Sequence, residues 1–262
     1  MEFSPEARIA EIYKTLAGIW GPQHWWPAQS RFEVIVGAYL TQNTSWSNVE
    51  LAMRKLRAAG VLSVKGIREL PVRKLQRLIR SSGYFRQKAR KLKRFVSFLD
   101  QQHGGSLNRM FAQPTSVLRE QLLSLNGVGP ETADSILLYA GQRPVFVVDA
   151  YTKRIAARHA ILAENASYED VRQLFERSLT GCAVMPAAAM TACGPAALQP
   201  SRMSLARRSG RVQVFNEMHG LIVGVGKQYC LKARPKCEEC PLRQLLPAAG
   251  LASRVGPDSP GI

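Results

Sequence analysis

The chain has 262 residues, 46% of them hydrophobic, so it can bury a substantial core and is not composed like a disordered chain. Lysine and arginine number 36 against 19 aspartates and glutamates, giving a formal net charge of +17. This excess favours a polyanionic partner, most often nucleic acid, although a solubility surface or a ribosome-associated protein has a similar composition. The sequence has neither a signal-peptide pattern nor an apolar run of membrane-spanning length. We therefore expect a cytoplasmic protein, nucleoid-associated if bacterial, with no membrane partner.

Apolar residues recur at helical spacing and strand patterns are scarce, so the sequence predicts an all-α fold. The expected helices span 5–20, 32–40, 48–59, a segment after Pro71, 87–99, 114–125, 131–140, 151–159, 168–179 and 212–225. Leu51 and Leu56 are expected to face the core, and Gly104 to break the chain after its helix. Residues 180–211 are rich in Ala, Pro, Met and Ser, which predicts a flexible insertion, and 247–262 are expected to form a disordered tail.

A glycine hairpin, Leu125-Asn126-Gly127-Val128-Gly129-Pro130, separates two of the expected helices. Its glycines permit positive φ and leave no side chain between the backbone and a ligand, while Val128 can anchor the turn in the core. The next helix begins at Pro130, so its free N–H groups and its dipole can face a phosphate. The sequence therefore predicts a helix-hairpin-helix over 117–140, which binds the DNA backbone without reading bases.

Asp149 ends the apolar run Val145–Val148 immediately before another expected helix. The usual structural role of an aspartate there is to cap the helix. Its place shortly after a DNA-binding hairpin favours a second role, as a carboxylate that takes part in chemistry on the bound strand.

The segments L-N-G-V-G-P-E-T-A-D and V-V-D-A-Y-T-K-R, followed by a cysteine cluster, resemble the endonuclease III superfamily of base-excision DNA glycosylases. The resemblance implies a two-lobed helical fold that acts as a monomer on damaged double-stranded DNA. Residues 1–29 would pack with a C-terminal lobe made of 151–179 and 212–246, and 30–150 would form the helical domain with the hairpin. It also implies that Asp149 lies against the sugar of an extruded nucleotide, where it stabilises the oxocarbenium-like state and orients the attacking water.

Glu131 stands where superfamily members that also cut the strand carry a lysine, whose amine forms a Schiff base with the sugar. A carboxylate cannot do this, so the resemblance implies a monofunctional glycosylase that leaves an abasic site. Two alternatives stay open. One is a bifunctional glycosylase and AP lyase that uses Lys153 or the N-terminal amine, although Lys153 can equally contact a phosphate. The other is a non-catalytic DNA-binding paralogue.

Further residues align with DNA-facing positions of the superfamily. Gln42 matches a glutamine that fills the space left by the flipped base, and Tyr84 matches a residue that inserts opposite the lesion. A basic run that includes Arg86 and Lys88 follows Tyr84 and is expected to contact DNA together with Lys153. Tryptophans in the N-terminal quarter either stack on a flipped base or pack in the core: Trp25, Trp26 and Trp46.

Cys230, Cys237 and Cys240 resemble the superfamily's four-cysteine loop, which holds a 4Fe–4S cluster, but Leu246 stands at the fourth position. Cys182, Cys193 or His219 could supply the missing ligand, and zinc bound by three cysteines and a histidine is another possibility. A degenerate or empty loop also stays open. The substrate also stays open among alkylated purines, uracil or thymine mispaired with guanine, and, ranked last, adenine opposite oxidised guanine. The segment V-V-D-A-Y slightly favours the alkylated purines.

Overall fold

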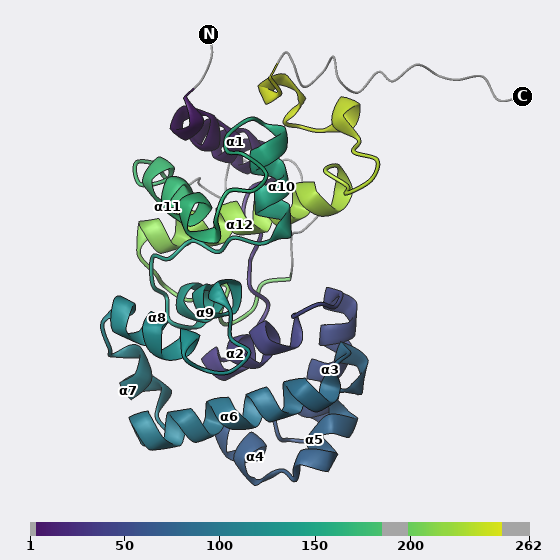
Figure 1. The fold of residues 1–262 in the computed structure, drawn as a ribbon, viewed down its shortest axis with the longest axis vertical. Helices are drawn as coiled ribbons and strands as arrows, with labels where there is room; N and C mark the ends of the chain where they lie inside the picture. The colour runs from purple at the N-terminus through teal and green to yellow at the C-terminus, as the bar shows by residue number, and fades with distance from the viewer. Residues whose placement is uncertain (1–3, 185–198, 248–262) are drawn as a thin grey trace, which may run out of the picture. The chain divides into compact units, whose positions relative to one another are not determined.

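A computed structural model describes residues 4–184 and 199–247. Within these ranges the regular structure is entirely helical, with no strand, which confirms the predicted all-α class. The described residues divide into two compact units (Figure 1): unit 1 comprises 4–25, 146–184 and 209–247, and unit 2 comprises 26–145 and 199–208. The boundaries expected from the sequence were 29 and 150. No helix in the described part of the chain is both long and apolar enough to cross a membrane.

Unit 2 is built around a long helix, α6 (Phe85–His103), with α2, α4, α5 and α7 packed along it. Its buried stripe includes Leu92, Phe95 and Leu99, while its charged residues lie largely on the other side. The elements of this unit are α2 (Arg31–Leu40), α3 (Trp46–Ala58), α4 (Val64–Glu69), α5 (Val72–Leu78), η1 (Arg80–Ser82), α6, α7 (Leu107–Phe111), α8 (Thr115–Leu123), α9 (Pro130–Ser135) and the π-helical segment η2 (Ile136–Ala140).

Unit 1 is centred on α12 (Gly210–Gln228), which packs against α1 (Pro5–Trp20) and α10 (Ala150–Arg158). Every residue from Val214 to Gly226 is buried, so this helix has no solvent-exposed face over that stretch. A helix that is covered all round lies at the centre of its unit. The remaining elements are α11 (Tyr168–Ser178), η4 (Cys237–Glu239) and η5 (Arg243–Leu245).

Polar caps explain where many of these helices start. In six of them the hydroxyl of an N-cap serine accepts a hydrogen bond from a backbone N–H of the first turn; these serines are Ser4, Ser30, Ser63, Ser106, Ser167 and Ser209. Gly104 ends α6 in the left-handed conformation, with φ 55°, which confirms the predicted break.

The structure corrects two predictions. Leu51 does not face the core: it is 37% exposed, whereas Val49, Ala52 and Met53 share the buried face of α3 with Leu56. The helix starts earlier than expected, at Trp46, and the inward stripe follows that register.

Residues 199–208 of the predicted insertion belong to unit 2. Met203 is buried and donates its N–H to the Ala28 carbonyl, while the Ala28 N–H donates to Ser201 Oγ. Ser201 and Ser204 also form hydrogen bonds with each other. Hydroxyl contacts therefore order this segment, although its composition offers little apolar surface to bury. Residues 185–198, Cys193 and most of the predicted tail lie outside the described residues.

Candidate active site

The two glycines of the hairpin in unit 2 have different backbone conformations. Gly127 has φ 85°, which favours glycine, so the prediction of positive φ is confirmed there. Gly129 has φ −92° and ψ 175°, an ordinary extended conformation, so it does not use the positive φ that glycine permits. A Cβ on Gly129 would meet nothing within 4 Å. Val128 is buried between them, which confirms its role as the anchor of the turn.

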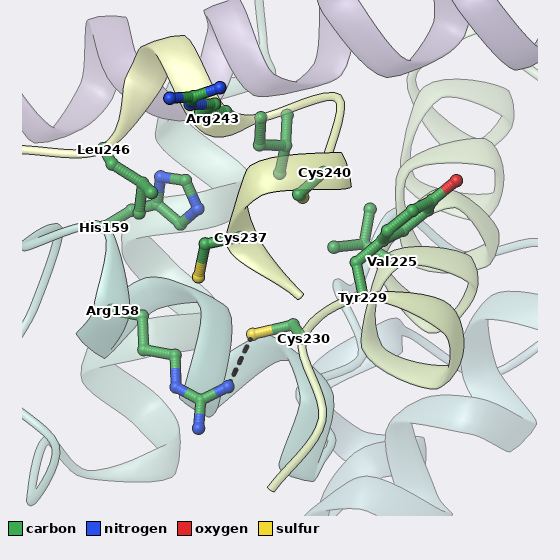
Figure 2. A pocket seen from close by; sticks show the side chains of 10 residues that line it. Arg158, His159, Val225, Tyr229, Cys230, Cys237, Cys240, Arg243 and Leu246 are labelled. Carbon is green, nitrogen blue, oxygen red and sulfur yellow. Dashed lines mark hydrogen bonds between the residues drawn. The ribbon is translucent and has the colours of Figure 1, made fainter. Parts of the chain in front are cut away.

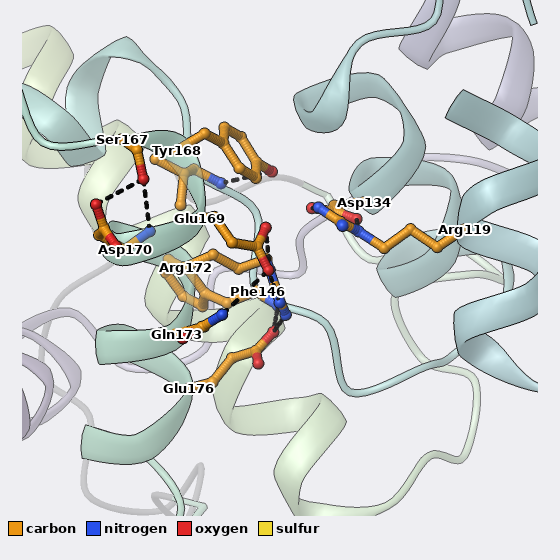
Figure 3. A network of polar contacts seen from close by, with 11 residues as sticks. Arg119, Asp134, Phe146, Ser167, Tyr168, Glu169, Asp170, Arg172, Gln173 and Glu176 are labelled. Carbon is orange, nitrogen blue, oxygen red and sulfur yellow. Dashed lines mark hydrogen bonds and ion pairs between the residues drawn. The ribbon is translucent and has the colours of Figure 1, made fainter. Parts of the chain in front are cut away.

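A buried ion pair joins the two helices of the hairpin. Arg119 on α8 binds Asp134 on α9 through two hydrogen bonds, of 2.7 and 3.0 Å. Figure 3 shows these two side chains. The Asp134 side chain is fully buried and that of Arg119 is 20% exposed. Because a planar guanidinium fixes both oxygens of a carboxylate, this pair sets the relative position of α8 and α9.

Gln42 lies at the hairpin. Its Nε2 donates to the Gly127 carbonyl at 3.1 Å and to Thr132 Oγ1 at 2.9 Å. Lys91 of α6 donates to Gln42 Oε1 at 2.7 Å. The Lys91 stem also covers the hairpin, because a Cβ on Gly127 would lie 2.2 Å from Lys91 Cε.

Tyr84 lies at the tip of the turn before α6. Its side chain is 65% exposed and its φ is 42°, an uncommon conformation for a residue with a side chain. Arg86 is also exposed, with its guanidinium 6.0 Å from the Phe85 ring centroid. Lys88 differs from the prediction: it is 2% exposed, and its Nζ donates to the carbonyls of Leu40 and Ser82. An ammonium in this place joins two segments of the protein and is not presented to a phosphate.

In unit 1, Asp149 caps α10, and the two oxygens of its carboxylate have different surroundings. Oδ1 accepts hydrogen bonds from the Thr152 N–H at 2.7 Å and from Thr152 Oγ1 at 2.9 Å, which with the return contact forms a capping box. Oδ2 lies 3.6 Å from Nε2 of His219 on α12. The side chain remains 14% exposed. One oxygen therefore holds the helix end, and the other is available for chemistry.

The apolar run before Asp149 is extended but belongs to no sheet, so its backbone donors need other partners. Side chains of α11 supply them: the Phe146 N–H donates to Glu176 Oε1 at 2.8 Å, and the Val148 N–H donates to the Tyr168 hydroxyl at 3.3 Å. Arg172 in turn binds Glu176 at 2.6 Å and also pairs with Glu169 (Figure 3). This network fixes the approach of the chain to Asp149.

The helix α12 supports Asp149 from another side. His219 is buried, with its ring 6.0 Å from that of Trp25. Burial lowers the pKa of His219, and the charge of Asp149 partly opposes this, so the imidazole is neutral near pH 7. Gly226 allows α10 to approach closely, because a Cβ there would lie 2.2 Å from Tyr151 Cδ1.

Two lysines bear on the lyase alternative: Lys153 lies near the start of α10, and Lys227 lies near the end of α12. Lys153 Nζ donates to the Ala166 carbonyl at 3.0 Å. Desolvation lowers the pKa of Lys227, and the Asp149 charge acts against that shift. Lys227 is therefore a further amine to consider besides Lys153, and the charge of Asp149 acts on its pKa. The sequence alone gave no reason to consider it.

These features match a known family. A family model described as the HhH-GPD superfamily of base excision DNA repair proteins matches residues 36–180, a range that contains both the hairpin and Asp149. The chain belongs to this superfamily.

Relatives and solved structures agree with that assignment. The chain is 39% identical over 237 residues to a candidate DNA repair glycosylase of Methanocaldococcus jannaschii, covering 90% of this chain and 94% of that protein. It is 29% identical to the endonuclease III-like protein 1 of Bos taurus, over 85% of this chain and 61% of that one. The fold is similar to that of H. pylori 3-methyladenine DNA glycosylase, MagIII, bound to 1,N6-ethenoadenine, with 26% identity, a TM-score of 0.67, and coverage of 86% and 98%. A trapped endonuclease III–DNA covalent intermediate shares the fold at 20% identity, with a TM-score of 0.69 and coverage of 95% and 98%. The protein is thus a DNA repair glycosylase of the HhH-GPD superfamily.

The cysteine loop of this HhH-GPD protein has only part of the donor set expected for an iron–sulfur cluster. Cys230, Cys237 and Cys240 line one pocket, as Figure 2 shows. Leu246 lines it too, at the place of the fourth cysteine. Arg158 donates to Cys230 Sγ at 3.1 Å, and burial and the neighbouring cysteines raise the pKa of Cys240 to about 11.

Of the residues that the sequence suggested for the missing ligand, Cys193 lies outside the described residues, and the other two lie away from the cysteine loop. His219 lies beside Asp149, and Cys182 donates to the Ser178 carbonyl; neither lines the pocket. His159 does line it, with Nδ1 3.2 Å from the Leu245 carbonyl. Within the described ranges no group of three or more His, Cys, Asp or Glu side chains is arranged to hold a metal ion. The residues present therefore do not fit a four-cysteine cluster.

Two of these tryptophans, Trp25 and Trp26, are buried, and Trp46 packs against one of them. Trp25 and Trp26 are 7% and 6% exposed, and the Trp26 ring packs against Trp46 and Tyr139 at 5.1 and 5.2 Å. Sequence reasoning missed Thr152, Lys91 and the role of His219. A threonine three residues after an aspartate is a readable signal for a capping box, whereas the other two depend on contacts between distant segments.

Proposed function

We propose that this chain is a monofunctional DNA glycosylase that acts as a monomer on damaged double-stranded DNA. In the reaction, the bond between the base nitrogen and C1′ breaks and its electron pair leaves with the base. Water adds to C1′, and its proton passes to the medium or to the departing base. The products are a free base and an abasic site. Asp149 Oδ2 supplies the negative charge that stabilises the cationic sugar and orients the water.

The observation that carries the proposal is the pair of carboxylates, Asp149 and Glu131. Oδ2 of Asp149 is not used by the helix cap, so its charge is available to a substrate. Glu131 is exposed in the first turn of α9, where the strand-cutting members of the superfamily carry a nucleophilic amine. A carboxylate at that position supports hydrolysis without a Schiff base.

The substrate class we propose is an alkylated purine. The V-V-D-A-Y segment favours this class, and the structural relative MagIII, named as a 3-methyladenine DNA glycosylase, is 26% identical to the chain. Alkylation also weakens the bond to the sugar by placing positive charge on the base. A fixed carboxylate needs to add only modest stabilisation to such a leaving group.

The test uses duplexes that carry one alkylated purine, with base release and strand cutting measured before and after alkali. We expect wild-type protein to release the base and to cut the strand only after alkali, with no protein–DNA adduct trapped by borohydride. Glu131→Lys should gain a trapped adduct. Glu120→Lys makes the same charge change on the exposed face of α8 and is the matched control.

Strand cutting by wild-type protein without alkali would contradict the proposal. The second candidate is a bifunctional glycosylase and lyase, for which Lys153, Lys227 and the N-terminal amine are the amines to test. Loss of the borohydride adduct in Lys227→Gln or in Lys153→Gln would then identify the amine. Absence of base release from every lesion would instead support a non-catalytic DNA-binding paralogue.

For the cysteine loop we propose a degenerate site without a complete 4Fe–4S cluster, because Leu246 replaces the fourth cysteine. Visible absorbance and metal analysis of freshly purified protein test this. Strong visible absorbance with four irons per chain would contradict it, and stoichiometric zinc would favour the alternative of three cysteines and a histidine.

A further inference from the structure

Lys88 is a fully buried lysine in the first turn of α6. It is 2% exposed and among the largest buried side chains of the protein. Burying an ammonium is unfavourable unless strong hydrogen bonds replace its water. Two backbone carbonyls do so: Nζ donates to Leu40 O at 2.8 Å and to Ser82 O at 2.5 Å.

Both carbonyls belong to segments that lead directly into DNA-facing residues. Leu40 is the last residue of α2, and Gln42 follows two positions later. Ser82 is the last residue of η1, and Tyr84 follows two positions later in its left-handed conformation. One ammonium therefore links the backbone just before Gln42 to the backbone just before Tyr84.

The next turn of α6 extends this linkage to the hairpin. Lys91 donates to the Gln42 side chain, and its stem lies against Gly127. Lys88 thus fixes the backbone that carries Gln42, and Lys91 fixes the Gln42 amide. All these contacts lie within unit 2 and depend on a single helix.

We infer that Lys88 is a positioning residue that holds Gln42 and Tyr84 in one fixed arrangement, so that the two side chains enter the duplex together when a base is extruded. This rests on the proposed function, because only an enzyme that extrudes a base needs both insertions. Extrusion is opposed by the loss of base stacking, which a correctly placed pair of side chains offsets. Without Lys88, each segment would still fold but would insert independently.

Lys88→Met keeps the length of the stem and removes the ammonium, and it tests the inference. Single-turnover base release is measured on a normal duplex and on one in which the damaged base is already unpaired. Extrusion is followed separately by the fluorescence of 2-aminopurine at the target position. We expect release from the paired duplex to fall by about 10- to 100-fold, with a much smaller loss on the unpaired substrate and a weaker fluorescence rise. Binding to undamaged DNA should change little.

Lys93→Met is the matched control, because Lys93 lies on the same helix and donates to the Arg68 carbonyl, away from both DNA-facing segments. It should leave extrusion unchanged. In a protein that already carries Gln42→Ala and Tyr84→Ala, Lys88→Met should have little further effect on extrusion. Lys88→Gln, which retains one donor, is used if Lys88→Met does not fold.

Equal losses on paired and unpaired substrates, or an undiminished effect in the double-variant background, would overturn the inference and assign Lys88 a purely structural role. Wild-type rates in Lys88→Met would overturn it as well. If wild-type protein releases no base at all, the proposed function fails, but the fluorescence signal still reports on Lys88.

Discussion

Two helix N-termini, one in each unit, carry candidate functional residues, and one of them lacks the side-chain cap that the other has. In unit 2, α9 begins at Gly129 and Pro130 with no side-chain cap. In unit 1, α10 has Asp149 at its N-cap: the carboxylate accepts from the Thr152 N–H, and the Asp149 N–H donates in return to Thr152 Oγ1, which completes a capping box. An uncapped N-terminus keeps its N–H groups for an external anion, whereas a capped one carries an anion of its own. The same backbone feature can therefore bind a phosphate in one place and position a reacting carboxylate in another.

The most direct way to break this comparison is to remove the charge of Asp149 and keep the cap. Asparagine caps a helix about as well as aspartate, so Asp149→Asn should fold with nearly unchanged stability. Base release should fall by at least about 10³-fold, because the amide cannot stabilise a cationic sugar. Single-turnover kinetics and thermal unfolding measure the two effects. Base release at the wild-type rate would show that Asp149 is mainly a cap.

The ion pair that joins the hairpin helices predicts the next largest effect. Arg119→Met leaves Asp134 buried without its guanidinium and should lower the free energy of unfolding by about 3 kcal/mol. Urea unfolding measures this. Arg68→Met removes an exposed pair with Asp100 and should change stability little. Equal effects of the two substitutions would contradict the structural role of the buried pair.

The two hairpin glycines give a matched test of the uncapped end. Gly127→Ala requires a side chain at φ 85° and displaces Lys91, so it should destabilise the fold by about 1–2 kcal/mol and weaken DNA binding. Gly129→Ala should fold normally, because its Cβ meets only open space. If the Gly129 backbone approaches a phosphate, this second variant should still bind DNA more weakly. Fluorescence anisotropy at two salt concentrations measures both affinities.

Thr152→Val tests the capped N-terminus of α10. It removes the hydrogen bond from Thr152 Oγ1 to Asp149 Oδ1 and leaves Asp149 Oδ2 unchanged. We expect a loss of about 1 kcal/mol in stability and only a small change in the rate of base release. A loss in rate comparable to that of Asp149→Asn would mean that both oxygens serve catalysis.

The smallest expected effect is on the pH dependence of stability. Burial and the nearby Lys91 lower the pKa of Lys88 to about 8 from 10.5. Above pH 8, Lys88 is largely deprotonated in the folded protein but still protonated in the unfolded chain. The free-energy cost of burying its charge therefore falls as the pH rises. Wild-type stability should therefore increase relative to Lys88→Met by somewhat less than about 1 kcal/mol between roughly pH 7 and 8.5. A constant difference would contradict the lowered pKa.

Sequence patterns predicted the local features well, because these depend on a few adjacent residues. The helices, the hairpin with its buried Val128, and the Asp149 cap all follow from short motifs. The register of α3 was less accessible, since both Leu51 and Val49 are apolar and only packing selects between them. The ordered segment around Ser201 was missed because hydroxyl pairing does not show in composition. His219 beside Asp149, and Lys88 beneath Gln42 and Tyr84, depend on contacts between distant segments.

The close contact between α10 and α12 has a consequence for the position of Asp149. Gly226 admits the Tyr151 ring so tightly that even a methyl group would collide with it. The position of Asp149 is therefore set by a rigid pair of helices and not by an adjustable loop. A larger residue at position 226 would push the two helices apart and move the carboxylate that we propose as the reacting group.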